Sequence, residues 1–595
     1  MGWVDGVSGG KPNPPRRRHF AGHRAAGSPF GLEPVAVRRM EGFTLNTPSA
    51  PDQSGTVGSE RSRTVAGFGP HDLKTESACD APHLRHARVE RCSHLSEGVP
   101  GISRRALLTG SAAAGLSAAV GLGAAPAAAA AGTRSAASRA GKSRYTRVVD
   151  VAVVGAGLSG LVAARELTRR GLSTVVIEAS HRVGGRMVRK PVIENGWIDL
   201  GGQWIGPTQT AILDLAESLG VRHFDFHTRG RNVLYYGGAR STFTGAFPPV
   251  AGEDEDFPGV SPADLKEAEA VWGRFLALSG TVDVEKPWLT PDAAELDSQT
   301  VTQWAKDATT SPFARFGVDY WTLNQEGADP SETSMLFDLA SYAAGPDDEE
   351  PELWLFEGGA GQIPPLLAEE LGDRVVLDQP VQRIDQDASG VTATTTGGRY
   401  RAGFAIVATP PYLAGAIDYT PAMPARRLQL TQREPMGAVI KYAAVYPTAW
   451  WRDQGLSGIT VSDLAVLGTV DSSPPSGVPG ILTGFVSGPD AIVLADRSAS
   501  ARRRAVLKNL ATYFGPRTLN PAQFVEMNWP QEKWTGGAYN AFLGPGVLST
   551  YGPAMTEPVG RIHWAGAEAS SKWAGYFDGA VRAGQAAARA VAGRS

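Results

Sequence analysis

The sequence predicts an α/β protein of at least two domains, one of them built on a parallel sheet. The 595 residues are more than one hydrophobic core usually holds. A strand–turn–helix–strand pattern follows at residues 148–177. Hydrophobic residues make up 42% and charged residues 20%, as in ordinary soluble proteins. The net charge of -3 and the lack of a nucleic-acid-binding motif argue against a nucleic-acid partner.

The pattern of the N-terminal residues indicates an export signal rather than part of the folded enzyme. Residues 1–100 are rich in Gly, Pro, Arg, Ser and His without a helical or strand period, so we expect disorder, or an extension ahead of the true start codon. Residues 101–132 contain Arg104 and Arg105 and then an Ala-rich stretch, and resemble a Tat-type signal cleaved within 124–131. An Ala-rich linker or a membrane anchor is the alternative. We therefore expect export to the periplasm or the exterior of a bacterium.

Cysteine usage limits the chemistry of the main body. Cys79 and Cys92 are the two cysteines, and both precede the signal. The remaining chain has no thiolate for a disulfide framework, a metal site or a nucleophile. We predict no metal site.

A dinucleotide-binding pattern begins immediately after the signal region. The apolar run 148–154 predicts a buried parallel strand, 158–169 an amphipathic helix, and 173–177 a second strand that ends at Glu178. A glycine-rich turn joins the first strand to the helix. This order is typical of a Rossmann-type domain.

Each residue of that turn has an expected role. Gly155 permits the tight turn, Gly157 lets the backbone approach a pyrophosphate, and Gly160 lets helix and strand pack closely. The helix N-terminus offers free N–H groups to the phosphates. Glu178 is placed to accept hydrogen bonds from the ribose hydroxyls.

The next loop favours FAD over NAD. His181–Arg186 follows Glu178 directly and resembles the second phosphate-and-ribityl loop of FAD oxidases of the glutathione-reductase type. Gly184 and Gly185 allow close backbone approach, and Arg182 or Arg186 can neutralise pyrophosphate. A surface Arg/Gly loop is the alternative.

From residue 148 to 593 the chain resembles the flavin monoamine oxidase family. The resemblance rests on six motifs in order: the glycine-rich turn, Asp199–Gln209, Gly358–Ile363, Phe404–Pro411, Met436–Lys441 and Trp564–Ala580. It implies that further residues contact FAD. These are Gly202, Gln203, Trp204, Val381 (through its backbone near the adenine), Trp529, Gly566 and Glu568. Core packing is an equal alternative for Trp529.

The resemblance also implies the reaction and its catalytic residues. Oxidation occurs at the carbon bearing the amine nitrogen, with hydride passing to the flavin, hydrolysis of the imine, and oxygen reduced to hydrogen peroxide. Lys441 matches the family's active-site lysine, which holds a water and assists reoxidation; a surface lysine on a strand is the alternative. Tyr539 and Tyr576 match the family's aromatic cage for the amine, with two core tyrosines as the alternative.

Two departures from the family carry predictions. Membrane-bound relatives attach FAD through a cysteine before the first cage tyrosine, whereas this chain has Ala538, so we predict non-covalent FAD. Such relatives also end in a transmembrane tail, and no apolar stretch of that length precedes Ser595. We therefore expect no membrane anchor.

The substrate is open at this stage. The paired tyrosines favour a primary aromatic or aliphatic monoamine. An L-amino acid would need a cation for its carboxylate, and Gln203 and Trp204 occupy the position where related enzymes place arginine; an arginine from 224–354 could substitute. Cyclic or secondary amines, diamines and polyamines are further alternatives. A flavin protein without oxidase turnover is a different class, and the intact Lys441 and tyrosines argue against it.

The expected architecture is discontinuous. The FAD-binding domain, of the glutathione-reductase type, comprises residues 147–223, 355–430 and 532–593. An α+β substrate domain fills 224–354 and 431–531, with the flavin ring between the two. Family members are often homodimers, but nothing in the sequence fixes the oligomeric state. Among the aromatic residues at 320, 321, 337 and 342, helix packing is a more common role than lining a pocket.

Overall fold

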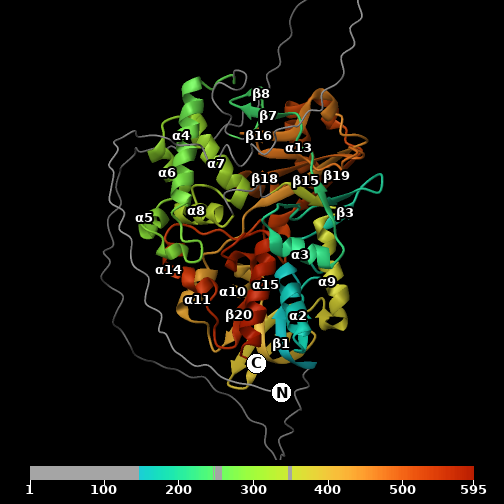
Figure 1. Ribbon diagram of the computed structural model, residues 1–595, viewed down its shortest axis with the longest axis vertical. Coiled ribbons are helices and arrows are strands. Elements are labelled where there is room, and N and C mark those ends of the chain that lie inside the picture. Colours follow the sequence, from blue (N-terminus) through green and yellow to red (C-terminus); the bar gives the residue numbers. More distant parts are fainter. Residues whose placement is uncertain (1–145, 246, 248–256, 346–351, 595) are drawn as a thin grey trace, which may run out of the picture. The chain divides into compact units, whose positions relative to one another are not determined.

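The computed structural model describes residues 146–245, 247, 257–345 and 352–594 (Figure 1). The expectations for residues 1–100 and for the signal at 101–132 lie outside these residues. All described residues belong to one compact unit. None of the described helices is both long enough and apolar enough to cross a membrane.

An eight-stranded sheet carries the dinucleotide-binding pattern. Its order is β10-β2-β1-β13-β12-β11-β14, with β20 paired to β13. The strands are β1 (Arg147–Val154), β2 (Thr174–Ile177), β10 (Val375–Val376), β11 (Val381–Asp387), β12 (Gly390–Thr395), β13 (Arg399–Val407), β14 (Asp418–Thr420) and β20 (Ile562–Trp564). The neighbours β10, β2, β1, β13 and β20 pair in parallel, while β12 is antiparallel to β11 and to β13.

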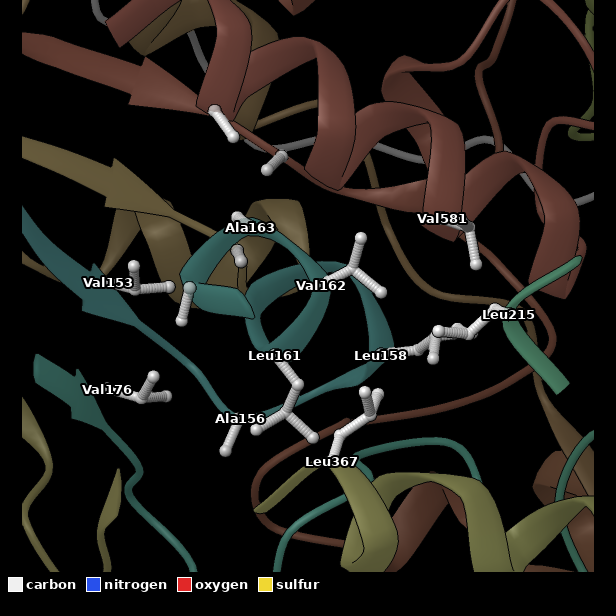
Figure 2. Close-up of a cluster of buried hydrophobic side chains, with 14 of the residues drawn as sticks. Val153, Ala156, Leu158, Leu161, Val162, Ala163, Val176, Leu215, Leu367 and Val581 are labelled. Carbon is white, nitrogen blue, oxygen red and sulfur yellow. The ribbon is translucent and has the colours of Figure 1, made fainter. Parts of the chain in front are cut away.

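Helix α2 (Leu158–Arg169) fixes the glycine-rich turn against this sheet. It packs beside α15 (Phe577–Ala592), which lies next to it in Figure 1. Leu161 and Val162 of α2 are buried in a cluster with Val153, Leu367 and Val581 (Figure 2). Because apolar residues of α2 pack both against the sheet and against α15, the start of the helix is held where β1 ends.

The second large sheet is mixed and has seven strands, in the order β19-β15-β18-β17-β16-β7-β8. The strands are β7 (Arg231–Tyr236), β8 (Ala239–Phe243), β15 (Val439–Tyr446), β16 (Leu456–Ser462), β17 (Gly468–Asp471), β18 (Gly480–Ser487) and β19 (Gln523–Asn528). Neighbouring pairs are antiparallel except β16 with β7. The strands of the two large sheets thus come from the segments expected for the two domains.

Helices pack around the second sheet and bury an aromatic-rich core. The core includes residues of α4 (Pro262–Ser279), α6 (Val301–Ala308), α7 (Pro312–Glu326) and α8 (Met335–Ala343). Its rings include Trp321 of α7, which meets Tyr342 of α8 edge to face at 5.2 Å between centroids. Such contacts fix the position of α7, one face of which becomes a wall of the site.

The remaining elements are short or peripheral. The strands are β3 (Arg189–Pro191), β4 (Trp197–Asp199), β5 (Trp204–Ile205), β6 (His223–Asp225) and β9 (Trp354–Phe356). The α-helices are α3 (Thr210–Ser218), α5 (Ala293–Ser298), α9 (Ile363–Leu371), α10 (Pro411–Gly415), α11 (Ala425–Thr431), α12 (Gly488–Ala495), α13 (Ala499–Phe514) and α14 (Val547–Tyr551). Short 3₁₀ turns lie between them, among them η2 (Ala360–Gln362) and η6 (Trp529–Gln531).

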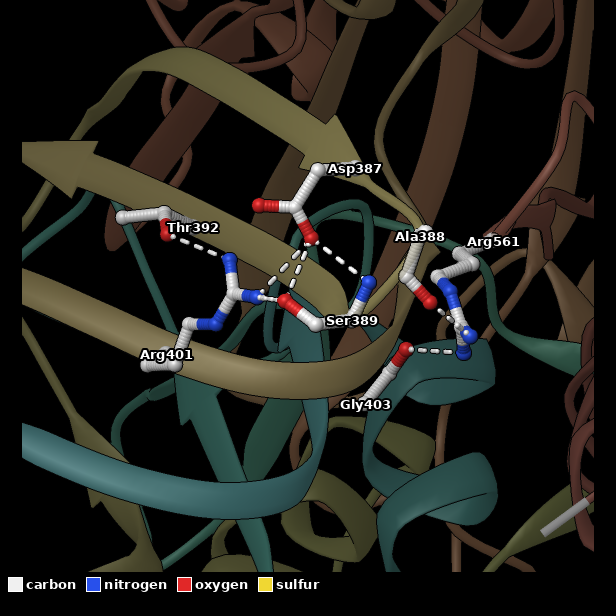
Figure 3. A network of polar contacts seen from close by, with 7 residues as sticks. All are labelled: Asp387, Ala388, Ser389, Thr392, Arg401, Gly403 and Arg561. Carbon is white, nitrogen blue, oxygen red and sulfur yellow. Dashed lines mark hydrogen bonds and ion pairs between the residues drawn. The ribbon is translucent and has the colours of Figure 1, made fainter.

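A polar network holds the β11–β12 turn against β13 (Figure 3). Asp387 accepts from the Ser389 backbone N–H at 2.7 Å and from Arg401 at 3.0 Å. Arg561 donates to the carbonyl oxygens of Ala388 and Gly403. The hydrogen bonds from Ser389 and Arg401 hold the pKa of Asp387 well below its usual range.

Candidate active site

A single cavity of about 1920 Å³ connects the glycine-rich turn to the aromatic-rich helices. Sixteen of the eighteen residues that the sequence predicted for the site line it. They are Gly155, Gly157, Glu178, Arg182, Gly184, Gly185, Arg186, Gly202, Gln203, Trp204, Val381, Lys441, Trp529, Tyr539, Gly566 and Tyr576. Gly160 and Glu568 lie behind this wall, outside the lining. The cavity is therefore continuous from the dinucleotide pattern to the tyrosine pair.

The glycines at the end of β1 have the geometry that their expected roles require. Gly155 has φ +102°, and a Cβ there would lie 2.6 Å from the carbonyl oxygen of Ala408. A Cβ on Gly160 would collide with the carbonyl oxygen of Gly155. At Gly157, by contrast, a Cβ would meet nothing within 4 Å. This turn leaves open space over a helix N-terminus, where a pyrophosphate can approach the backbone.

Glu178 and Arg182 form part of the wall and are already hydrogen-bonded. The carboxylate of Glu178 accepts the Ala156 N–H at 2.6 Å and the Ser180 N–H at 2.8 Å. Burial raises its pKa, and these backbone hydrogen bonds oppose that rise. Arg182 donates to the carbonyl oxygen of Gly185 at 2.9 Å. Glu178 thus also braces the turn, in addition to facing the space where we expected ribose hydroxyls.

Arg186 binds a protein carboxylate, a partner that the sequence did not indicate. Its Nη1 lies 2.7 Å from Oε1 of Glu568 and 2.7 Å from the carbonyl oxygen of Tyr539. Burial alone would raise the pKa of Glu568, but the Arg186 charge and its hydrogen bonds lower it. The guanidinium charge is therefore balanced by Glu568, which acts from behind the cavity wall.

Lys441 is a fully buried lysine on the second sheet, in the strand next to the edge strand β19. Its strand β15 lies between β18 and β19, and all eight residues of the strand are buried. The Nζ atom donates to the carbonyl oxygen of Gly201 at 2.8 Å and to Oε1 of Gln203 at 2.7 Å. It also lies 4.6 Å from the ring centroid of Trp204. The alternative of a surface lysine is wrong.

Burial controls the charge of Lys441. It lowers the pKa of Lys441 to about 7, while the carboxylates of Asp199 and Glu352 act in the opposite direction. Burial also raises the pKa of Asp199, which accepts the backbone N–H groups of Ala360 and Gly361 at 2.7 and 2.9 Å. The Asp199 carboxylate favours the protonated form of Lys441, and the Lys441 charge favours the ionised form of Asp199. Near physiological pH, the Nζ atom of Lys441 can therefore gain or lose a proton.

The two predicted cage tyrosines line the cavity from separate loops. Tyr576 is the residue immediately before α15, and its hydroxyl donates to Oε1 of Gln325 at 3.4 Å. The ring of Tyr539 meets Phe485 edge to face, 5.6 Å between centroids. Phe485 lies directly across the strand pair from Lys441. The lysine and Tyr539 are thus linked through one aromatic ring.

Several lining residues were missed in the sequence. One face of α7 lines the cavity, with Gly317, Asn324 and Gln325, which the sequence did not indicate, and with Tyr320 and Trp321, for which lining a pocket was the less common of two expected roles. These residues are three and four positions apart, so the sequence could have shown that they share one face of a helix. It could not have shown that this face lines a cavity. Trp321 and Tyr342 both line the cavity and pack in the helical core, so the two expected roles are combined; Phe337 packs in the core without lining it.

Glu352 is an acidic residue in the wall of the cavity. It lines the cavity, and its carboxylate acts electrostatically on Lys441, Tyr539 and Tyr320. No motif pointed to it. A carboxylate near two tyrosine rings favours a positively charged ligand.

The residues present fit a bound FAD. The open space at Gly157, the parallel approach of Gly184 to Gly157 and the cavity reaching to Lys441 suit a long dinucleotide. Trp529 is 2% exposed, donates to the carbonyl oxygen of Leu200 at 2.9 Å, and still lines the cavity. It therefore combines core packing with a place in the site.

Comparison with known proteins supports the same cofactor. The family model for flavin containing amine oxidoreductase matches residues 158–592. The chain belongs to this family. FAD held by these residues would supply hydride-transfer chemistry.

Other members of this flavin-containing family differ in their names. An L-amino acid dehydrogenase of Synechocystis sp. is 43% identical over 448 residues, covering 75% of this chain and 95% of that protein. Amine oxidase [flavin-containing] A of Bos taurus is 33% identical over 464 residues, covering 75% and 85%. A cyclohexylamine oxidase from Brevibacterium oxydans has a TM-score of 0.69 at 35% identity, covering 75% and 99%. A putrescine oxidase bound to putrescine has a TM-score of 0.69 at 33% identity, also covering 75% and 99%.

Proposed function

We propose that this flavin-containing oxidoreductase oxidises primary amines with oxygen as acceptor, releasing an aldehyde, ammonia and hydrogen peroxide. The observation that carries the proposal is the joining of a buried lysine, two tyrosine rings and a carboxylate in one cavity with the glycine-rich turn. The rings of Tyr539 and Tyr576 bind and orient the amine, and Lys441 lines the same cavity with a nitrogen whose lowered pKa lets it accept a proton.

The charges of the cavity favour an amine over an amino acid. An α-carboxylate needs an unpaired cation near the tyrosines. Arg186, whose guanidinium donates to the Tyr539 carbonyl oxygen, is paired with Glu568. Arg274, the cavity-lining arginine of the region 224–354, is exposed on α4 and donates to the Ala308 carbonyl oxygen. Glu352 would repel a carboxylate and attract an ammonium.

Oxidation of L-amino acids is the second candidate. It is favoured by the 43% identity to a protein named L-amino acid dehydrogenase. In that case Arg186 would have to exchange Glu568 for the substrate carboxylate. The name of that relative also makes an acceptor other than oxygen the alternative to peroxide formation.

The test is product analysis with the purified holoprotein. Tyramine, phenethylamine, putrescine, spermidine, nicotine and common L-amino acids are supplied in air, and peroxide, ammonia and aldehyde are measured. We expect equimolar peroxide, ammonia and aldehyde from tyramine or phenethylamine. Turnover of L-amino acids alone would overturn the amine assignment, and flavin bleaching without peroxide would overturn oxygen as acceptor.

A matched variant tests the electrostatic part. Glu352→Gln keeps the size of the side chain and removes its charge, and Glu357→Gln is the control, since Glu357 pairs with exposed Arg222 at the surface. We expect KM for the amine to rise about three- to tenfold in Glu352→Gln, within the range of one partly screened charge interaction. An unchanged KM would show that the charge of Glu352 does not contribute to amine binding.

A further inference from the structure

Helix α7 ends on two side chains that reach the two tyrosine loops. Gln325 accepts a hydrogen bond from the Tyr576 hydroxyl. Glu326, the next residue, has no exposed surface, and its Oε2 accepts from Nδ2 of Asn540 at 2.9 Å. Asn540 directly follows Tyr539 in the chain. Consecutive residues of one helix therefore contact both loops.

Asn540 lies where three segments meet. Its carbonyl oxygen accepts the Gly437 N–H at 2.9 Å, and Ala538 donates its N–H to the Gly437 carbonyl oxygen at 2.9 Å. A Cβ on Gly575, the residue before Tyr576, would lie 3.3 Å from Cγ of Asn540. The asparagine side chain thus lies between the Tyr539 loop, the Tyr576 loop and the segment leading into β15.

A carboxylate at Glu326 is expensive to bury, which calls for a reason. Glu326 and Asp338 of α8 are both fully buried, and neither lines the cavity. Burial raises the pKa of Glu326. Burial and the neighbouring Glu326 charge raise the pKa of Asp338 well above its usual value, which favours its protonated form. Burying such a carboxyl group lowers the stability of the protein. Its presence is explained if it holds a specific geometry.

We propose that Glu326 is a positioning residue that holds the Tyr539 ring opposite Tyr576 through its hydrogen bond to Asn540. The inference rests on the proposed amine-binding role of the two tyrosines. Glu326 does not touch the amine: it acts on the loop that carries one ring, while Gln325 contacts the other ring. Loss of the hydrogen bond would let the rings separate, and a displacement of about 1 Å can reduce a rate on the order of a hundredfold.

Exchanging the donor and the acceptor of the Glu326–Asn540 hydrogen bond tests the proposal. Glu326→Gln keeps an acceptor oxygen for Asn540 and is expected to stay within about threefold of the wild-type kcat/KM, as a neutral hydrogen bond replaces a charged one. Asn540→Asp places two carboxyl groups face to face and removes the donor. We expect at least a tenfold loss at pH 8 and a smaller loss at pH 6, where a shared proton restores the hydrogen bond. The double variant Glu326→Gln/Asn540→Asp restores it with reversed polarity and should recover most of the loss.

Readouts other than turnover separate positioning from folding and from the proposed function. FAD content should match the wild type in each variant, whereas Tm should fall in Asn540→Asp, where two buried carboxyl groups face each other, so all rates are measured well below the lowest Tm. The Kd of tert-butylamine, a primary amine without a hydrogen on its reacting carbon, should rise in Asn540→Asp and recover in the double variant. Asp297→Asn is the control for a buried carboxylate remote from the cage: Asp297 accepts from Ser334 and Ser549, and its replacement should lower Tm without changing the Kd.

The outcomes are distinct. If the wild type oxidises no amine, the proposed function fails before any variant is compared. If the wild type is active and Asn540→Asp equals it, or the folded, FAD-loaded double variant is no better than Asn540→Asp, the positioning role is wrong. Should Asn540→Asp fail to bind FAD, Asn540→Ala removes the donor without adding charge, and an unchanged Kd for tert-butylamine there would equally overturn the proposal.

Discussion

The buried ammonium group of Lys441 predicts a pH-dependent step in turnover. Its pKa is lowered to about 7 by burial, and its two hydrogen-bond partners are both acceptors. If the neutral amine is the active form, the active fraction rises about tenfold between pH 6 and pH 8. The assay is kcat at saturating amine, so that protonation of the free substrate has little effect. Lys441→Met should lack this rise and retain a low, flat rate.

A second variant identifies the titrating group. The Asp199 carboxylate raises the pKa of Lys441, so Asp199→Asn should move the midpoint of the step to lower pH. A step of unchanged size and midpoint in Lys441→Met would refute the reasoning, because another group would then be titrating.

The pH dependence of the free energy of unfolding provides an independent test. A lysine with a lowered pKa binds fewer protons folded than unfolded between about pH 7 and its ordinary value of 10.5. Its contribution to stability should therefore rise with pH across that window, and this slope should vanish in Lys441→Met.

Three further predictions follow from the cage, the cofactor and the N-terminal segment. Tyr539→Phe keeps the ring and should stay within about threefold of wild-type kcat/KM, whereas Tyr539→Leu should lose about five- to thirtyfold, as expected for one ring–cation contact; equal losses would assign the role to the hydroxyl. Because Ala538 stands where a cysteine would attach the flavin, acid precipitation should release all FAD into the supernatant, and yellow pellet would disprove non-covalent binding. Replacement of Arg104 and Arg105 by Lys should retain the protein in the cytoplasm; undiminished export would exclude a Tat-type signal.

The dinucleotide pattern was predictable because each of its parts is local. The helix expected at 158–169 ends where α2 ends, and the first strand extends one residue earlier than expected, to Arg147. The glycines are required by backbone geometry alone, and Gly155, with its positive φ and its close approach to Ala408, shows why. Local constraints of this kind appear directly in the sequence.

The chemistry of the site was less predictable because its partners are distant in sequence. The ion pair of Arg186 with Glu568 spans 382 residues, and the Glu326–Asn540 hydrogen bond spans 214. Strand alternation gave Lys441 an even chance of exposure, but β15 is covered on both faces, so alternation carried no information. Glu352 is one acid among many in the sequence and becomes significant through its place in the cavity.

The most direct test of the central claim is the ratio of kcat/KM for phenethylamine to that for L-phenylalanine, measured as peroxide release by the holoprotein. The two molecules differ by the α-carboxylate alone. With Arg186 paired to Glu568 and Glu352 lining the same cavity, the account predicts a ratio of at least about a hundred, since burying a carboxylate without pairing it to a cation costs several kcal/mol. A ratio below one would contradict the account and show that the cavity recognises an amino acid.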